Sequence, residues 1–417
     1  MSDEIALTAG APLPGLPSGW RPFRIARVAD ESSVIRSFYL EPADGGALDP
    51  ALAGQHLPIR LTLPEGGEPI IRTYTISCAP VTGHYRISVR KLGLASTHLH
   101  DAVGQGSIIG AKTPAGDFVI DDTATHAAVL VAAGVGITPL LAMLSHLVAG
   151  EAAGRPMRPV TLFYAARSVE ERAFDEEIAK LCAIAGSKLR VVRLLQQTDG
   201  AVEGRDYEEA GVLQSAVFAR YLGFGRHDFY MCGPPPFMQA IYTALRDLGV
   251  ADSAIHAEAF GPASLIRTSD DPAPAVALQQ AAHADETVLF NPSGTVAVWS
   301  PGSGSLLELA EAAGLSPEFG CREGACGACK TRLVAGQVAY LRTTSAAHGA
   351  DEVLICSAVP AARAQGEPER SNACAPAVAV SAQQSGEKAR AIFSPIHYWR
   401  GRDWVVPEVA ARAYAPA

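Results

Sequence analysis

Three cysteines in one short run constrain this 417-residue chain more than any other feature. Cys321, Cys326 and Cys329 have C-x4-C-x2-C spacing, which together with a more distant cysteine is the ligand spacing of a four-thiolate 2Fe-2S cluster. Cys356, at the end of an apolar run, is the expected fourth ligand. Glycines and alanines between the first three cysteines suit a tight loop whose N–H groups face the cluster sulfurs. The pattern predicts transfer of single electrons.

Two alternatives for these cysteines are a zinc site and disulfide bonds. Zinc sites usually show C-x2-C pairs, and only one pair here has that spacing. Disulfides are disfavoured because the chain opens Met-Ser-Asp-Glu without the basic and apolar regions of a secretory signal. The other cysteines are scattered and form no second motif: Cys78, Cys182, Cys232 and Cys374.

Composition narrows the class of partner. The chain is 48% hydrophobic and carries a net charge of -9, which argues against nucleic acid and is compatible with docking to a basic patch on another protein. Residues 127–150 contain no Asp, Glu, Lys or Arg, which is long enough for a membrane span. Gly134, Gly136 and Pro139 interrupt this stretch, so we predict a buried strand, a turn and a helix instead, and a cytoplasmic location.

The residue pattern changes several times along the chain and predicts six segments. They are a leader (1–19), an antiparallel β-barrel (20–123), an α/β domain with a parallel sheet (124–262), a linker (263–284), a third domain (285–362) and a tail (363–417). The first half of the tail reads as disordered, and its later aromatic residues could dock a partner or fold back on the protein's own surface.

Short segments with clear periodicity support these domains. Barrel strands are expected at 23–28, 33–40 and 84–90, and parallel strands at 128–131 and 160–164. Helices are expected at 170–184 and 237–248. In the third domain, strands at 287–290 and 294–300 precede a capped helix at 305–313.

Four motifs carry residues suited to cofactors. In the barrel, the run 72–75 places Arg, Tyr and Thr at a strand edge, although these are common strand residues. The run 93–97 puts a glycine turn and two hydroxyls before a short helix. In the α/β domain, glycine turns at 134–139 and 232–235 each follow a buried strand and precede a helix. In a parallel sheet both turns face the ligand crevice, although the first lacks the third glycine of G-x-G-x-x-G.

Arg-x-Tyr-Thr, Gly-x-x-Ser, Ala-Gly-Val-Gly-Ile-Thr-Pro, Cys-Gly-Pro-Pro and the cysteine loop follow one another between about Trp20 and Pro360. In this order they resemble the ferredoxin-NADP reductase superfamily. The chain looks most like a flavohaemoglobin-type reductase module fused to a C-terminal plant-type 2Fe-2S ferredoxin domain, as in oxygenase reductase components. The resemblance implies FAD in the barrel, NAD(P) in the α/β domain and a β-grasp fold for the ferredoxin domain.

The resemblance also implies a role for each motif residue. Tyr74, Thr75, Cys232 and Glu258 would act at the flavin and nicotinamide rings. Cofactor contacts would come from Arg72, Tyr74, Thr75, Ser96, Thr97, Gly134, Gly136, Thr138, Pro139, Cys232, Gly233 and Phe260. The metal ligands would be Cys321, Cys326, Cys329 and Cys356.

The sequence leaves the choice of flavin, the choice of nicotinamide nucleotide and the role of three histidines open. Related reductases bind FMN, so FAD rests on the flavohaemoglobin-like runs 99–101 and 258–261. NADH is favoured over NADPH by the resemblance alone, and Arg167 after the second parallel strand could meet a 2'-phosphate. His56, His98 and His100 could form a metal site, but surface or hydrogen-bonded histidines are the better interpretation because carboxylate or cysteine neighbours are missing.

The expected function is an electron relay. NAD(P)H would give a hydride to FAD, and single electrons would pass through the 2Fe-2S cluster to a partner protein, either an oxygenase or another metalloenzyme. One alternative is an enzyme that reduces a small acceptor such as a quinone, an iron chelate or oxygen. Another is a redox-sensing protein that binds the same cofactors without turnover.

Overall fold

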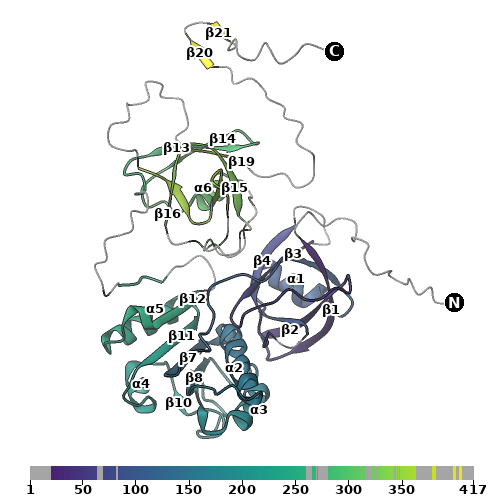
Figure 1. The fold of residues 1–417 in the computed structure, drawn as a ribbon, viewed down its shortest axis with the longest axis vertical. Coiled ribbons are helices and arrows are strands. Elements are labelled where there is room, and N and C mark those ends of the chain that lie inside the picture. The colour runs from purple at the N-terminus through teal and green to yellow at the C-terminus, as the bar shows by residue number, and fades with distance from the viewer. Residues whose placement is uncertain are drawn as a thin grey trace, which may run out of the picture. The chain divides into compact units, whose positions relative to one another are not determined.

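The computed structural model describes residues 20–62, 69–80, 83–259, 265–268, 280–315, 329–341, 348–362, 378–381, 398–400 and 403–405, with single positions between 270 and 346. The chain divides into two compact units, 1–383 and 384–417. The second unit contains a short antiparallel hairpin of β20 (Tyr398–Arg400) and β21 (Asp403–Val405). The first unit contains three sheets that correspond to the three predicted domains (Figure 1).

The first sheet is a six-stranded antiparallel barrel-like sheet with strand order β4-β3-β6-β1-β2-β5. Its core consists of alternating inward residues such as Phe38, Leu57 and Ile87, which are fully buried. The helix α1 follows β5. The elements are β1 (Arg21–Asp30), β2 (Ile35–Pro42), β3 (His56–Leu61), β4 (Ile70–Thr75), β5 (Tyr85–Arg90), α1 (Leu94–Ala102) and β6 (Ile108–Ala111).

The second sheet has six strands in the order β10-β9-β8-β7-β11-β12, and its neighbouring strands are parallel. Helices connect most of the strands, as expected for an α/β domain, and a segment without a helix leads from β9 to β10. The strands are β7 (Ala127–Ala133), β8 (Val160–Ala166), β9 (Leu189–Leu195), β10 (Glu209–Ala210), β11 (His227–Gly233) and β12 (Ile255–Ala259). The helices are η1 (Gly134–Gly136), α2 (Ile137–Ala152), α3 (Asp175–Ala185), η2 (Gly186–Lys188), α4 (Ser215–Tyr221), α5 (Pro235–Asp247) and η3 (Asp252–Ala254).

The uncharged stretch 127–150 is divided between β7, η1 and α2, as the sequence predicts. The helical part, Gly134–Ala152, is long and apolar enough to cross a membrane by length and composition, and 67% of its apolar window is buried inside the protein. Leu140, Leu144 and Leu147 pack in the core beside the parallel sheet. This segment is therefore a core helix of the α/β domain.

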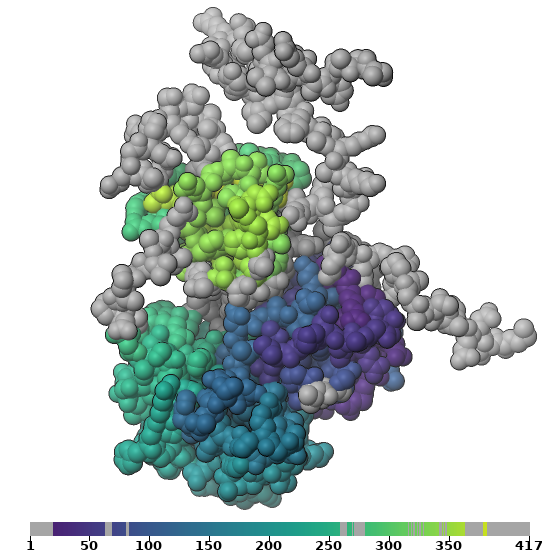
Figure 2. Space-filling view, in the orientation of Figure 1, coloured from purple at the N-terminus to yellow at the C-terminus, as the bar shows by residue number. Residues whose placement is uncertain are grey.

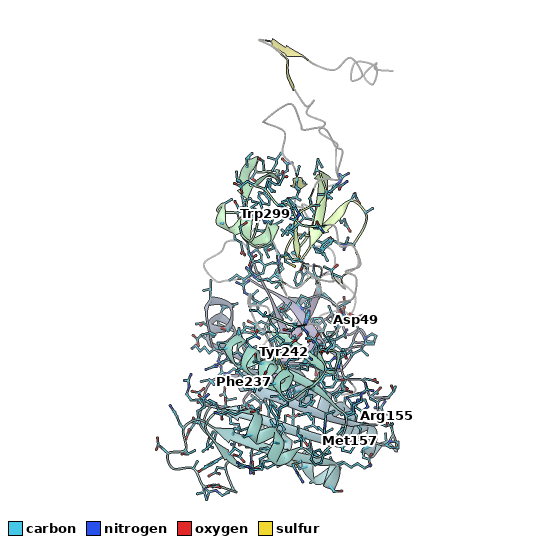
Figure 3. All side chains as sticks on the ribbon, turned by 90° about the vertical axis from the view of Figure 1, so that its left-hand side faces the viewer. Asp49, Arg155, Met157, Phe237, Tyr242 and Trp299 are labelled. Carbon is cyan, nitrogen blue, oxygen red and sulfur yellow. The ribbon has the colours of Figure 1, made fainter. Side chains whose placement is uncertain are left out.

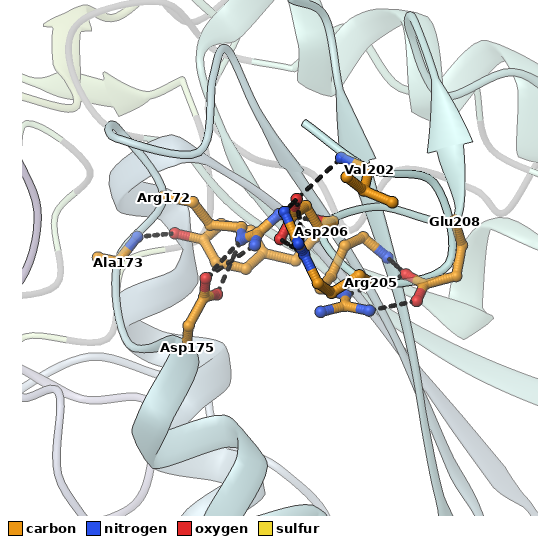
Figure 4. A network of polar contacts seen from close by, with 9 residues as sticks. Arg172, Ala173, Asp175, Val202, Arg205, Asp206 and Glu208 are labelled. Atoms are coloured by element: carbon orange, nitrogen blue, oxygen red, sulfur yellow. Dashed lines mark hydrogen bonds and ion pairs between the residues drawn. The ribbon is translucent and has the colours of Figure 1, made fainter. Parts of the chain in front are cut away.

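The helix α3 begins five residues later than the sequence predicts, at Asp175 rather than at Glu170. Phe174, just before it, has a φ of 66° and is buried, so the backbone turns there before the helix starts. Arg172 links this turn to the segment between β9 and β10 (Figure 4). Its guanidinium pairs with Asp175 at 2.8 Å and donates to the carbonyl of Asp206. These bonds connect two loops at one edge of the sheet.

The barrel and the α/β domain are in direct contact, and Figure 2 shows their atoms side by side in purple to teal. Arg86 of β5 pairs with Glu177 of α3 at 2.6 Å, and its side chain is almost fully buried. The backbone N–H of Asp121 donates to the hydroxyl of Tyr230 in β11. These polar contacts fix the two domains to each other and so define the cleft between them.

Part of the predicted linker packs on the α/β domain. Gln239 of α5 exchanges hydrogen bonds with the backbone of Ile266, and Tyr242 accepts from the backbone N–H of Thr268. Figure 3 labels Tyr242 on this helix. The composition of this segment predicts a loose linker. Its described residues after β12 instead pack along α5.

The third sheet has the order β14-β13-β19-β15-β17, with a parallel β13–β19 pair and antiparallel neighbours elsewhere. This mixed sheet with the helix α6 confirms the predicted α+β domain. Its elements are β13 (Glu286–Asn291), β14 (Thr295–Trp299), α6 (Leu306–Ala312), β15 (Lys330–Ala335), β16 (Val338–Tyr340), β17 (Glu352–Leu354), β18 (Ala358–Pro360) and β19 (Val378–Ser381). Ser305 caps α6 through a capping box with Glu308.

The strand β19 lies in the segment predicted as a tail. It pairs with β13 on one side and with β15 on the other, and Val378 and Val380 are buried in the core of this domain. The third domain therefore extends beyond residue 362, and the expectation of a disordered first half of the tail is wrong for residues 378–381. The remainder of 363–397 lies outside the described residues.

Candidate functional site

A cavity of about 780 Å³ opens between the barrel and the α/β domain. This volume lies in the range of cofactor sites. Its wall brings together eight residues that the sequence assigns to cofactors, from four separate motifs and from β12. They are Arg72, Tyr74, Thr75, Ser96, Gly136, Thr138, Gly233 and Glu258.

Arg72 provides a positive charge in this cavity. Its Nη1 donates to the carbonyl of Ile71 at 2.7 Å, and in the described part of the chain no carboxylate pairs with the guanidinium. Burial lowers the pKa of Arg72 from its usual value, which leaves an arginine charged at neutral pH. A half-buried guanidinium without an anionic partner suits a phosphate group.

Tyr74 and Thr75 form the wall beside Arg72. Burial raises the pKa of Tyr74 to about 12, so its ring is neutral and its phenol stays protonated. Thr75 is buried and lies opposite His56 in the β3–β4 register. An aromatic ring next to a buried hydroxyl fits a flat ring system that also needs a hydrogen bond.

The start of α1 forms another part of the wall. Gly93 precedes the helix with a φ of 83°, and no side chain caps the first turn. The hydroxyl of Ser96 is engaged locally, since it accepts from the N–H of Leu92 at 2.7 Å and donates to the carbonyl of Gly93 at 3.0 Å. The backbone N–H groups at this helix start, more than the Ser96 hydroxyl, are therefore suited to a phosphate.

On the α/β side, Gly136 lets two elements approach closely. A Cβ atom there would lie 2.2 Å from the carbonyl oxygen of Cys232. The start of α2 thus packs directly on the end of β11, and the two glycine turns become neighbours. Thr138 donates from its hydroxyl to the carbonyl of Val135 at 3.0 Å, which stabilises the first turn of α2.

Some predicted residues lie elsewhere. Among the described residues, Thr97, Gly134, Pro139 and Cys232 are absent from the cavity wall, and Cys232 is fully buried behind it. Phe260 lies outside the described residues. The wall also contains residues that the sequence did not assign to it, among them His56, Arg90, Phe319 and Arg322. Arg322 lies within the cysteine run 321–329, which could have pointed to it, whereas His56, Arg90 and Phe319 lie in no motif that the sequence assigns to a cofactor.

Two of the four predicted cluster ligands are described. Cys329 precedes β15 and Cys356 follows β17, and both are buried in the core of the third domain. Burial raises the pKa of the Tyr340 phenol, and the nearby thiols of Cys329 and Cys356 add to the effect. Cys321 and Cys326 lie outside the described residues.

The described cysteines and their loop argue against the disulfide alternative. None of Cys78, Cys182, Cys232, Cys329 and Cys356 forms a disulfide. Gly324 in the cysteine loop has a φ of 78°, and a Cβ atom there would lie 2.5 Å from Thr344. The loop backbone thus requires a glycine where the 2Fe-2S motif predicts a tight turn.

Two family models match the chain. Residues 130–243 match an oxidoreductase NAD-binding domain, and residues 288–361 match a 2Fe-2S iron-sulfur cluster binding domain. Together with the barrel, these matches define an oxidoreductase that combines flavin, nicotinamide and 2Fe-2S sites.

Relatives of known name match the first two domains. Flavohemoproteins of Bordetella pertussis and Deinococcus radiodurans are 38% and 40% identical over 250 and 253 residues, 58% and 60% of this chain. These matches cover 61% and 62% of the two relatives. The solved flavohem-like FAD/NAD binding domain of nitric oxide dioxygenase from Vibrio cholerae is 34% identical, with a TM-score of 0.51, and the match covers 99% of that domain and 58% of this chain. The chain belongs to this family of flavohaemoglobin-type FAD- and NAD-binding modules.

A further solved structure shows the fold across a longer stretch. An intact type IV self-sufficient cytochrome P450 monooxygenase is 20% identical with a TM-score of 0.55, and the match covers 87% of this chain and 41% of that one. The fold of the three consecutive domains is thus confirmed.

Proposed function

We propose that this protein takes a hydride from NAD(P)H onto FAD and delivers single electrons through a 2Fe-2S cluster to a partner protein. The observation that carries the proposal is the composition of one cavity wall. Motif residues of the barrel and of the α/β domain face the same space, and Phe319 and Arg322 of the cysteine-loop region border it. Residues of all three predicted domains thus border a single cavity.

The chain's own residues would bind and orient the cofactor. Arg72 and the start of α1 supply positive charge and N–H groups for phosphates, while Tyr74 and Thr75 supply a flat surface and a hydrogen bond. When bound, a flavin supplies the conversion of a two-electron donor into a one-electron donor. Cys321, Cys326, Cys329 and Cys356 would hold the cluster.

We infer NADH as the preferred donor. Arg167, which the sequence offers as a contact for a 2'-phosphate, pairs with Glu171 at 3.1 Å, and Glu171 also lies 3.5 Å from Arg90. A carboxylate between two guanidinium groups reduces their attraction for an extra phosphate. This arrangement supports an unphosphorylated ribose.

The acceptor is proposed to be an oxygenase or another metalloenzyme, as the likeness of this domain order to a self-sufficient monooxygenase supports. A cytoplasmic location stays a prediction. A small acceptor such as a quinone, an iron chelate or oxygen, and a redox-sensing role without turnover, are the competing functions. Rapid NADH oxidation with artificial acceptors would exclude the sensing role, and full activity without a partner protein would favour the small acceptor.

The test separates the flavin from the cluster. We expect the Cys329→Ser variant to lose the 2Fe-2S absorption and electron paramagnetic resonance signals and the reduction of cytochrome c, but to keep NADH oxidation with ferricyanide. Cys182→Ser, a half-buried cysteine in α3, is the matched control and should retain all four. Unchanged spectra in Cys329→Ser would contradict the proposal.

A further inference from the structure

A buried histidine and a buried glutamate meet at the cavity where the two domains join. His56 lies on β3 of the barrel and Glu258 on β12 of the parallel sheet, and both line the cavity. Their Nδ1 and Oε1 atoms are 3.6 Å apart, with side chains only 7% and 10% exposed. Among the described residues, the second carboxylate oxygen of Glu258 has no hydrogen-bond partner. The pair is buried from solvent and faces the cavity.

The surrounding backbone holds the imidazole in place. His56 exchanges both backbone hydrogen bonds with Ala115, each at 2.9 Å. A Cβ atom on Gly116 would lie 2.9 Å from the ring, so the glycine makes room for the imidazole. On the other side of β3, the register places Thr75 opposite His56. The ring is therefore fixed beside the residue expected to meet the flavin ring.

The proposed function leaves one proton to account for. A hydride carries two electrons and one hydrogen nucleus. When the C4–H bond of the dihydronicotinamide breaks and both electrons leave singly through the cluster to one-electron acceptors, the nucleus remains as H⁺. One proton per hydride must therefore leave the cavity, and a group on its wall that accepts protons at neutral pH would assist this.

The titratable groups on the cavity wall limit which residue can accept this proton. Among the residues that the structure describes, these groups are His56, Arg72, Tyr74, Arg90, Glu258 and Arg322. Arginine stays protonated in proteins, and Tyr74 has a pKa of about 12, so neither type accepts a proton at neutral pH. His56 and Glu258 remain. At 3.6 Å the imidazole and the carboxylate are close enough for strong charge attraction once the imidazole is protonated.

We propose that His56, supported by Glu258, accepts the proton left behind when electrons depart singly, and releases it from the cavity. In this assignment His56 is the proton acceptor and Glu258 is a positioning residue that stabilises the imidazolium. The inference rests on the proposed function, because a proton is left over only if the electrons leave without it.

The first experiment measures proton transfer directly. Stopped-flow absorption follows flavin reduction by NADH and then cluster reduction, in H₂O and D₂O across pH. We expect His56→Ala to slow the second phase by about 100-fold, and to leave the first phase unchanged. Added imidazole should restore the second phase, and His98→Gln, at another barrel histidine outside the wall, should behave like the wild type in both phases.

A second measurement does not depend on turnover. In the full chain with oxidised cofactors, labelled with ¹³C-histidine, nuclear magnetic resonance gives the titration midpoint of His56. Glu258→Gln should lower that midpoint by about one pH unit or more, because it removes a nearby opposite charge.

The outcomes separate the two proposals. If the wild type does not reduce its cluster from NADH, the proposed function fails. If the wild type does so, but His56→Ala keeps the wild-type second phase, or imidazole fails to restore a slowed one, the proton-acceptor role is overturned. A midpoint that is unchanged in Glu258→Gln overturns the role of Glu258.

Discussion

The guanidinium of Arg72 lies 4.9 Å from the centre of the Phe319 ring. Arg322 approaches the same ring at 3.9 Å and pairs with Glu311 of α6. An aromatic ring of the cysteine-loop region is thus in contact with a cation of the flavin barrel and with a cation of its own domain. This contact joins the third domain to the wall of the cavity.

We predict that Phe319→Ala slows electron transfer from flavin to cluster. Each cation–π contact contributes up to about 2 kcal/mol, so losing the ring should lower the population of the contacting arrangement by up to about thirtyfold. Stopped-flow absorption should show a slower cluster phase with an unchanged flavin phase. Phe224→Ala, at a fully exposed phenylalanine, is the control. Equal rates of cluster reduction in the two variants would show that the Arg72–Phe319 contact does not affect electron transfer.

Arg72→Gln should weaken flavin binding. The variant removes a charge-assisted hydrogen bond worth about 1.5 to 3 kcal/mol, or about ten- to a hundredfold in Kd. Fluorescence titration of the apoprotein with FAD and with FMN measures the change and compares the two flavins. The exposed Arg24→Gln on β1, whose side chain pairs with Glu41, should bind flavin normally. If Arg72→Gln and Arg24→Gln bind flavin with the same Kd, the assignment of Arg72 to a flavin phosphate is wrong.

Glu171→Gln should raise the use of NADPH relative to NADH. The variant releases Arg167 from an exposed ion pair worth up to about 1 kcal/mol, so the ratio of kcat/KM values should shift by up to about fivefold toward NADPH. Steady-state kinetics with both nucleotides gives the ratio. Glu176→Gln, on the exposed side of α3, should leave it unchanged. A ratio that stays constant in Glu171→Gln refutes the role of this pair.

Asp228→Asn should destabilise the α/β domain. Arg158 is buried and lies 3.1 Å from Asp228, so the variant leaves a buried charge without its partner, at a cost of about 3 to 5 kcal/mol. Denaturant unfolding followed by circular dichroism measures the change. Asp122→Asn removes a similar carboxylate that pairs with Arg155 and His146 near the surface, and should cost under about 1 kcal/mol. Equal losses of unfolding free energy in Asp228→Asn and Asp122→Asn would contradict the argument that the buried pair is the costlier one to break.

The same carboxylate predicts a pH dependence. Burial acts to raise the pKa of Asp228, but the hydrogen bonds and charges of His126 and Arg158 outweigh it, and the pKa is lowered. Its stabilising contribution is therefore fully present above the unfolded value of about 3.9, and is lost as pH falls through the lower folded pKa. The stability difference between wild type and Asp228→Asn should shrink below about pH 4. A stability difference that grows as the pH falls would contradict the lowered pKa of Asp228.

The sequence predicted the elements whose pattern is local. The barrel strands, the parallel strands and the capped helix at Ser305 are confirmed, because alternation, apolar runs and a capping box each depend on neighbouring residues. The motif residues that line the cavity were also predicted, and their roles at the cofactors stay predictions.

Features that depend on distant contacts were missed. The strand β19 consists of four residues within an alanine-rich segment, and its partners β13 and β15 lie far away along the chain. The His56–Glu258 pair joins two domains, so no spacing in the sequence indicates it. Phe319 becomes significant only through the approach of Arg72 and Arg322.

The position of β19 has a consequence for how the protein matures. On the ribosome, the two nucleotide-binding domains and all four predicted cluster cysteines emerge before Val378, yet in the described part of the sheet β13 and β15 are joined through the strand that begins there. The reductase module can thus finish folding while the cluster domain still lacks its central strand. The sheet of the third domain would be completed last, after every strand of the flavin and nicotinamide domains has emerged.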